Sequence, residues 1–179
     1  TTPRSDFQEF ENPSGLINSP KTHQITGISW LQECWSAGYS GVLLADDMGL
    51  GKTFQTLAFL SWLIRKRQTI SLPKQPILII APTSLLGTWV NEAKMHLEES
   101  CLGSMTMLYG ADLRKAKIDG LKGNEVTTGQ LMLNLDILRG SDWVLTTYET
   151  MRDYQLSLSK LSFSCVIFDE MQKIKNITS

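Results

Sequence analysis

The sequence predicts an α/β fold in which helices cover both faces of a mostly parallel β-sheet. Short runs rich in leucine and β-branched residues alternate along the chain with longer stretches that contain no helix breaker. Some of these runs are continuously apolar, as in the Ile-Leu-Ile-Ile sequence at positions 77–80. Continuous apolar runs indicate strands that are buried on both faces, and such strands are typical of parallel sheets.

The expected elements follow in chain order. Prolines at positions 3, 13 and 20 predict a flexible leader over residues 1–20, and the rest of the chain, residues 21–179, is expected to form one domain. Its predicted elements are helix Thr22–Ala37, strand Gly41–Ala45, helix Lys52–Ile64, strand Pro76–Ala81, helix Leu85–Glu98, strand Ser104–Tyr109, strand Trp143–Thr147, helix Glu149–Gln155 and strand Cys165–Phe168. Residues 110–142 are interpreted as a long, mostly polar connection with an amphipathic piece around residues 131–135.

Local signals support the predicted helices. The helix from Lys52 ends at the Arg-Lys-Arg cluster of residues 65–67, where cations complement the helix dipole. The helix from Leu85 has apolar residues at helical spacing, which places Trp89 on its buried face. Thr146 and Glu149 have the Thr-x-x-Glu spacing of a capping box, so a helix is expected to begin there.

Composition limits the possible classes of protein. Of the 179 residues, 42% are hydrophobic, which is ordinary for a soluble domain. No stretch approaches the roughly 18 apolar residues of a membrane span and no signal peptide opens the chain, so we expect an intracellular protein without a membrane partner, cytoplasmic in a bacterium or nuclear in a eukaryote. Three scattered cysteines and two histidines argue against zinc and disulfides.

The stretch at positions 41–53 is the most informative part of the chain. An apolar run leads into a glycine-bearing loop that ends in Gly-Lys-Thr and is followed by a helical pattern. In such a loop, backbone N–H groups and the helix N-terminus bind phosphate oxygens, a lysine reaches the outer phosphates and a hydroxyl holds magnesium. Lys52 and Thr53 are the candidates for the last two roles. Asp46 stands where the general pattern has glycine, so the expected strand and helix on either side support the assignment.

A second apolar run, at positions 165–168, leads directly into two carboxylates. At the carboxyl edge of a parallel sheet, Asp169 is a candidate to position magnesium through a water, and Glu170 is a candidate general base for the attacking water. A solvated acidic strand end is the alternative. The phosphate-loop pattern upstream favours the catalytic interpretation.

Five blocks occur in a fixed order: His-Gln-Ile-Thr-Gly-Ile-Ser-Trp-Leu (23–31), Leu-Ala-Asp-Asp-Met-Gly-Leu-Gly-Lys-Thr (44–53), Ala-Pro-Thr-Ser-Leu-Leu-Gly-Thr-Trp (81–89), Leu-Thr-Thr-Tyr-Glu-Thr (145–150) and Asp-Glu-Met-Gln-Lys-Ile-Lys-Asn (169–176). Together they resemble the adenine-reading segment, motif I, motif Ia, the threonine-tyrosine block and motif II of the Swi/Snf-type helicase-like ATPases of helicase superfamily two. The resemblance implies the first, RecA-like, ATP-binding lobe of a P-loop NTPase motor.

The resemblance also implies residue roles. The nucleotide would be held by His23, Gln24, Asp47, Met48, Gly49, Leu50, Gly51, Lys52, Thr53 and Phe54. Gln24 would read adenine, and Thr53 with Asp169 would hold Mg²⁺. Lys52, Asp169 and Glu170 would be catalytic. The cofactors implied are ATP and Mg²⁺.

Two departures from the family pattern are visible. The loop carries Asp46-Asp47 where many members have Asp-Glu, and we associate the Asp-Asp form with bacterial members. Gln172 stands where other members have histidine. The chain also stops before the family's motif III and second lobe, which supplies arginines to catalysis. The missing lobe is therefore an expected partner, and the isolated chain is expected to be a nearly inactive monomer.

The net charge of −1 gives no bulk electrostatic support for a nucleic-acid partner, so local chemistry has to provide it. The resemblance implies contacts to the phosphate backbone of double-stranded DNA, for which Thr83, Ser84, Thr146 and Thr147 are the candidates. Helix capping is the alternative role for these hydroxyls.

The expected function is that of a DNA-dependent ATPase that translocates on double-stranded DNA as a remodelling protein. Two alternatives remain open from the residues alone. One is an RNA helicase of the same superfamily, and the other is a nucleotide-gated binding module that does not hydrolyse ATP.

Overall fold

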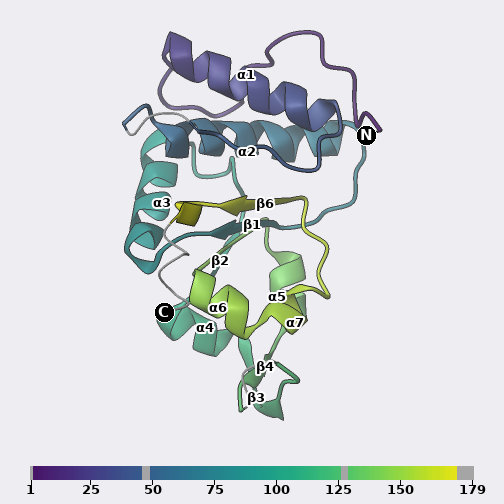
Figure 1. The fold of residues 1–179 in the computed structure, drawn as a ribbon, viewed down its shortest axis with the longest axis vertical. Coiled ribbons are helices and arrows are strands. Elements are labelled where there is room, and N and C mark those ends of the chain that lie inside the picture. Colours follow the sequence, from purple (N-terminus) through teal and green to yellow (C-terminus); the bar gives the residue numbers. More distant parts are fainter. Residues whose placement is uncertain (1, 46–48, 126–128, 173–179) are drawn as a thin grey trace. The chain divides into compact units, whose positions relative to one another are not determined.

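The computed structural model describes residues 2–45, 49–125 and 129–172 (Figure 1). The chain divides into two compact units. The first unit comprises Thr1–Leu72 and Trp89–Leu102, and the second comprises Pro73–Thr88 and Gly103–Ser179. The division falls within helix α3 (Thr83–His96), which contributes residues to both units.

Two long helices, α1 (Thr22–Ser36) and α2 (Lys52–Thr69), pack side by side in the first unit (Figure 1). Ile28 of α1 packs with Phe54 and Ala58 of α2 in a small core, against which Phe10 and Leu16 also lie. α1 matches the predicted helix to within one residue at its end, whereas α2 extends five residues beyond the predicted Ile64. Trp89 is buried, as the helical spacing predicts.

A parallel four-stranded sheet forms the centre of the second unit, in the order β2-β5-β1-β6. Its strands are β1 (Ile77–Ile80), β2 (Met105–Leu108), β5 (Trp143–Thr146) and β6 (Cys165–Phe168). β1 and β5 are fully buried central strands, as their continuous apolar sequences predict. β5 leads into α6 (Tyr148–Asp153) and α7 (Gln155–Leu158). Parallel strands that alternate with helices confirm the predicted α/β class.

The run Gly41–Ala45 differs from its prediction as a strand. It forms neither helix nor strand in the structure, and Leu43 is 77% exposed. A strand exists only through hydrogen bonds to a neighbouring strand. The run belongs to the first unit, whose described long elements are helices, while the parallel sheet belongs to the second. An apolar sequence alone therefore does not make this run a strand.

Residues 110–142 are more ordered than the predicted connection. They form α4 (Gly110–Lys115), β3 (Lys117–Lys122), β4 (Leu131–Leu133) and α5 (Leu135–Gly140), with β3 and β4 paired antiparallel (Figure 1). The amphipathic piece buries Leu133 in the core of the second unit, and the partly buried Leu135 packs against that core. Asn134 caps α5, because its side-chain oxygen accepts a hydrogen bond from the Asp136 N–H at 3.1 Å.

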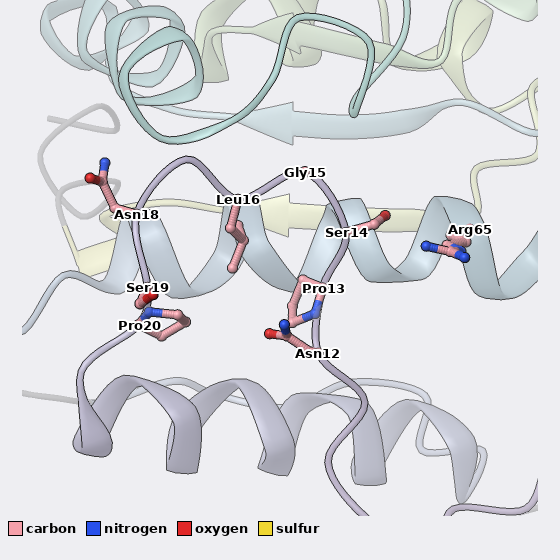
Figure 2. A pocket seen from close by; sticks show the side chains of 9 residues that line it. All are labelled: Asn12, Pro13, Ser14, Gly15, Leu16, Asn18, Ser19, Pro20 and Arg65. Atoms are coloured by element: carbon pink, nitrogen blue, oxygen red, sulfur yellow. The ribbon is translucent and has the colours of Figure 1, made fainter.

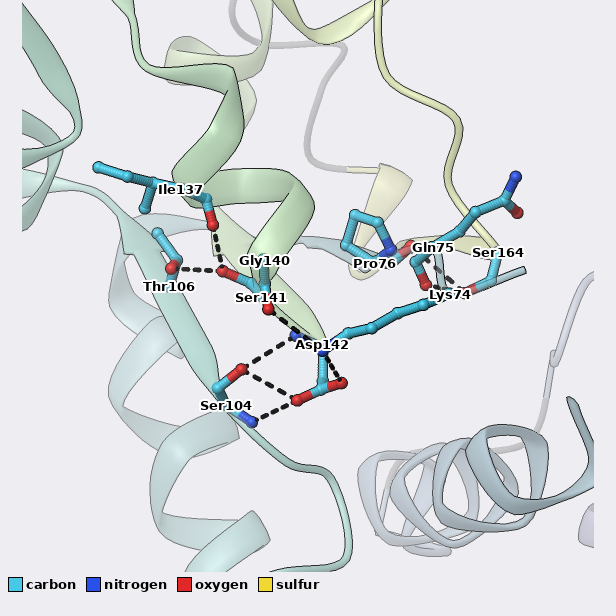
Figure 3. Close-up of polar contacts among 10 residues, drawn as sticks. All are labelled: Lys74, Gln75, Pro76, Ser104, Thr106, Ile137, Gly140, Ser141, Asp142 and Ser164. Carbon is cyan, nitrogen blue, oxygen red and sulfur yellow. Dashed lines mark hydrogen bonds and ion pairs between the residues drawn. The ribbon is translucent and has the colours of Figure 1, made fainter. Parts of the chain in front are cut away.

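A polar cluster joins the amino ends of β2 and β5 (Figure 3). The Asp142 carboxylate accepts hydrogen bonds from the Ser104 N–H at 2.8 Å and the Ser104 hydroxyl at 2.9 Å, and it pairs with Lys74 Nζ at 2.9 Å. Burial alone would raise the pKa of Asp142, but the hydrogen bonds from Lys74 and Ser104 outweigh burial and lower that pKa. The cluster stabilises the sheet at the amino ends of its strands, whereas Asp169 follows the carboxyl end of β6.

The first twenty residues make specific contacts, in contrast to the flexible leader expected from their prolines. Leu16 forms an antiparallel bridge with Leu97, and the buried Gln32 side chain exchanges two hydrogen bonds with the Glu11 backbone at 3.1 and 2.7 Å. The Glu11 carboxylate accepts hydrogen bonds from Trp62 Nε1 at 2.8 Å and Lys66 Nζ at 2.5 Å. These contacts hold the segment against α1 and α2.

We expect Glu11 to make the stability of the first unit dependent on pH. Burial alone would raise the pKa of Glu11. The hydrogen bonds from Lys66 and Trp62, together with the positive charge of Lys66, outweigh burial, so the pKa of Glu11 lies below its ordinary value. The stabilisation is therefore present above that ordinary value and is lost as pH falls through the lowered pKa. Because the Glu11 side chain is 43% exposed, solvent screening limits the effect to about 1 kcal/mol.

Urea unfolding at pH 7 and pH 3 measures this contribution. Glu11→Gln is expected to be less stable than the natural chain at pH 7, and the difference should be smaller at pH 3. The exposed Glu9 provides the control, since Glu9→Gln should change nothing at either pH. An equal loss for Glu11→Gln at both pH values would contradict the ionic contribution.

Candidate functional site

The phosphate-loop residues lie at the start of α2 in the first unit. Gly51 is the residue before the helix and adopts a left-handed φ of 77°, and Gly49 has a φ of 87°, conformations that glycine adopts without steric cost. Gly51, at the N-cap position of this 18-residue helix, has no side chain that could cover the first N–H groups. A helix start of this kind is suited to phosphate oxygens. Lys52 and Thr53 begin this helix, while Asp47 and Met48 lie outside the described residues.

The predicted adenine-reading glutamine lies against this loop. A Cβ atom on Gly51 would fall 2.6 Å from Gln24 Nε2, so the side chain occupies the space beside the glycine. Gln24 Oε1 accepts a hydrogen bond from the Lys21 N–H at 2.9 Å, which fixes the amide at the start of α1. The structure thus brings together two blocks that are 27 residues apart in sequence. His23 is exposed in the first turn of α1.

Gln55 is a neighbour of the loop that sequence reasoning missed. Its side chain is fully buried and donates a hydrogen bond from Nε2 to the Leu50 carbonyl at 3.2 Å. A Cβ atom on Gly27 of α1 would lie 1.9 Å from Gln55 Oε1, so the two helices approach closely at this point. The available signal was a glutamine among apolar residues at helical spacing, because a buried amide needs hydrogen-bond partners.

The two predicted acids lie at the carboxyl end of β6 in the second unit. The Asp169 N–H donates to the Ile80 carbonyl at 2.9 Å and so extends the ladder by one residue. Glu170 has a φ of 53°, in the left-handed region that is unfavourable for a residue with a side chain. Gln172 Nε2 donates to Glu170 Oε2 at 2.7 Å. Both acids are half-buried, and they lie at the carboxyl edge of the parallel sheet, where the sequence predicts them.

Tyr148 contacts the acidic turn and was not predicted as a site residue. Its hydroxyl donates to the Asp169 carbonyl at 2.7 Å, and its ring stacks on Phe168 with centroids 6.5 Å apart. Burial and the negative charges of Asp169 and Glu170 raise the pKa of Tyr148 to about 12. The hydroxyl therefore remains a hydrogen-bond donor throughout the physiological pH range.

The four candidate DNA-contact residues fall into two groups. Thr83 and Ser84 are exposed at the start of α3. Thr146 and Thr147 are buried, and the Thr146 hydroxyl donates to the Leu108 carbonyl at 3.1 Å. Thr147 caps α6 by accepting a hydrogen bond from the Thr150 N–H at 3.1 Å, so the predicted capping box on Thr146 is wrong by one residue.

A pocket of about 360 Å³ lies in the first unit (Figure 2). It is lined by residues 12–16 and 18–20 and by Arg65 of α2. None of the residues predicted to hold the nucleotide lines this pocket.

The described residues contain no group of three or more His, Cys, Asp or Glu side chains able to hold a metal ion. The hydroxyl of Thr53 in the first unit and the carboxylate of Asp169 in the second are each oxygen donors of the kind that Mg²⁺ prefers. Within the described part of the chain, no helix has the length and apolarity required to cross a membrane.

Comparisons with known proteins place these features in a family. The model of the SNF2-related domain matches residues 23–179. The chain is 38% identical over 163 residues to the Zorya protein ZorD of Escherichia coli O139:H28, covering 87% of this chain and 14% of that protein. It is 31% identical over 171 residues to the ISWI chromatin-remodeling complex ATPase ISW1 of Saccharomyces cerevisiae, covering 96% of this chain and 13% of that protein. The chain thus spans a small part of both relatives.

A solved structure agrees with the sequence relatives. The Sulfolobus solfataricus SWI2/SNF2 ATPase core in complex with dsDNA has a TM-score of 0.69 and 28% sequence identity to this chain, and the match covers 97% of this chain and 30% of that one. The family, the RecA-like fold and the ordered motifs therefore agree, and the chain belongs to the SNF2-related family of helicase-like ATPases.

Proposed function

We propose that this chain is the ATP-binding motor lobe of a DNA-dependent ATPase that translocates on double-stranded DNA. The observation that carries the proposal is the glycine-led start of α2, where the left-handed Gly51 precedes Lys52 and Gln24 lies beside it, in a chain of the SNF2-related family. A helix N-terminus supplies phosphate contacts, and the adjacent amide supplies a group that can recognise a base.

Each candidate residue has a role in this proposal. Lys52 contacts the outer phosphates, Thr53 and Asp169 hold Mg²⁺, and Glu170 orients and deprotonates the attacking water. Bound Mg²⁺ would supply charge stabilisation to the transferring phosphoryl group. Gln24 would read the adenine edge through its amide.

Contacts to DNA would come first from Thr83 and Ser84. Both are exposed at the start of the 14-residue helix α3, where hydroxyls and N–H groups can bind backbone phosphates without reading sequence. The similar Sulfolobus ATPase core was solved in complex with dsDNA, which supports a duplex partner. Thr146 and Thr147 would contribute through the position of their backbone, since their hydroxyls are used within the fold.

A second RecA-like lobe is proposed as the partner that completes catalysis. Positioning and arginine electrostatics from a completing element are worth roughly 10³-fold or more in phosphoryl transfer. This chain alone is therefore expected to bind nucleotide weakly and to turn it over at least about 10³-fold more slowly than the full natural protein.

The test is the rate of ATP hydrolysis by the full natural protein with no nucleic acid, with duplex DNA and with duplex RNA, at several salt concentrations. Stimulation by duplex DNA that weakens with salt is the expected result, because phosphate contacts release counterions. Stimulation by RNA alone would indicate an RNA helicase. Tight ATP binding without turnover on any nucleic acid would indicate a nucleotide-gated binding module.

A further inference from the structure

Tyr148 connects β5 and α6 to the acidic turn after β6. It follows Thr147, the capping residue of α6, and only 7% of it is exposed. Its hydroxyl reaches the Asp169 carbonyl, 21 residues away in sequence, at 2.7 Å. Resting on the function proposed above, we propose that Tyr148 is a positioning residue for ATP hydrolysis, holding the peptide between Asp169 and Glu170 in the orientation that water activation requires.

Peptide geometry explains why this contact reaches both acids. The Asp169 carbonyl belongs to the planar peptide group that also contains the Glu170 N–H. The Asp169 N–H is already held by the Ile80 carbonyl at 2.9 Å, so the tyrosine hydroxyl fixes the other side of the same residue. Because both the N–H and the carbonyl of Asp169 are hydrogen-bonded, the orientation of the peptide group that leads into Glu170 is fixed.

The backbone of Glu170 needs such support. Its φ of 53° lies in the left-handed region, which costs an ordinary residue about 1–2 kcal/mol. Unfavourable backbone conformations persist when surrounding contacts over-determine them. The stacked Phe168 ring packs the tyrosine from the strand side, with ring planes 24° apart. The phenol is thus fixed against the turn that carries the proposed general base.

The chain offers a closely matched control. Tyr154, at the end of α6, is also buried, and its hydroxyl donates to Gln130 Oε1 at 2.7 Å. Its hydrogen bond is as short as that of Tyr148, but its partner is not part of the acidic turn. Tyr148→Phe and Tyr154→Phe therefore each remove one buried phenol hydroxyl from the same unit.

The experiment compares both variants with the natural full-length protein by kcat and KM for ATP on duplex DNA, the affinity for a non-hydrolysable ATP analogue, and the thermal midpoint. For Tyr148→Phe we expect kcat about five- to tenfold lower, with KM and analogue affinity within about twofold, since loss of one hydrogen bond to the turn affects the chemical step. Tyr154→Phe is expected to keep kcat within about twofold.

The outcomes separate the two proposals. If the natural protein does not hydrolyse ATP, the proposed function fails whatever the variants do. If it hydrolyses ATP and the two variants lose kcat equally, the positioning role of Tyr148 is overturned. Loss of analogue affinity by Tyr148→Phe in step with a lower thermal midpoint would also overturn it, because the residue would then act only on stability.

Discussion

Replacing Lys52 by alanine should weaken nucleotide binding, whereas replacing Glu170 by glutamine should preserve binding and strongly slow turnover. Lys52 begins α2 directly after Gly51, and in the proposed site its ammonium would add a full positive charge to the helix N–H groups that bind phosphate. Its loss is expected to weaken ATP binding by at least about tenfold. Glu170 would act on the water rather than on the nucleotide, and loss of a general base typically slows turnover by about 10²–10⁴-fold.

Equilibrium binding of ATP and steady-state turnover on duplex DNA measure the two effects separately. Lys94→Ala and Glu99→Gln are suitable controls, because both residues are exposed and lie outside the proposed site. Both control variants should behave like the natural protein. Turnover by Glu170→Gln at the natural rate would assign the general base to another residue, and unchanged binding by Lys52→Ala would remove the phosphate loop from the proposed site.

Most of the parallel sheet was predictable from sequence because its strands carry their own signal. β6 has the predicted bounds, Cys165–Phe168, and β1 and β5 lie within one residue of theirs at each end. Burial on both faces of β1 and β5 demands apolar side chains along these strands, so their runs stand out from their surroundings. β6 has partly buried and exposed residues in alternation, but its run is also apolar, so the position of Asp169 and Glu170 after it followed directly from the sequence.

The elements that were missed depend on distant partners. α2 continues past the basic cluster at 65–67 because Lys66 pairs with Glu11 and Arg67 is buried, contacts that a local helix-end signal does not contain. β3 and β4 are short and mostly exposed, and their antiparallel pairing is set by register rather than by a strong apolar pattern. Propensity is a weak guide when tertiary contacts decide the boundary.

The residues of the candidate site also divide into those that local sequence predicts and those that depend on distant contacts. Lys52, Thr53 and the two acids belong to local motifs, so a scan of the sequence finds them. Gln55 and Tyr148 were not found, because what makes them neighbours of the site is a buried hydrogen bond to a backbone carbonyl. For Tyr148 that carbonyl lies 21 residues away. The motifs identify the groups that would touch the nucleotide, while the structure is needed to identify the groups that hold them.

The substitution Gly27→Ala is expected to lower the stability of the first unit by about 1–3 kcal/mol and to weaken ATP binding. The new methyl group would lie 1.9 Å from Gln55 Oε1 and 3.0 Å from its Cδ. Because Gln55 is fully buried, its amide has no open space to move into, and overpacking of this kind typically costs that amount. Displacement of the amide would also break its hydrogen bond to the Leu50 carbonyl in the phosphate loop.

A double-mutant cycle with Gln55→Ala tests the cause of this effect. Once the amide is absent the methyl group has room, so Gly27→Ala should add little further loss in the Gln55→Ala background, and the two effects should be strongly non-additive. Gly87→Ala is the control, because Gly87 lies in α3 with open space around its Cβ position. Alanine there should leave the free energy of unfolding unchanged or raise it by up to about 1 kcal/mol. Additive losses from Gly27→Ala and Gln55→Ala, measured by urea unfolding and ATP affinity, would show that the close approach of α1 to Gln55 does not hold the phosphate loop.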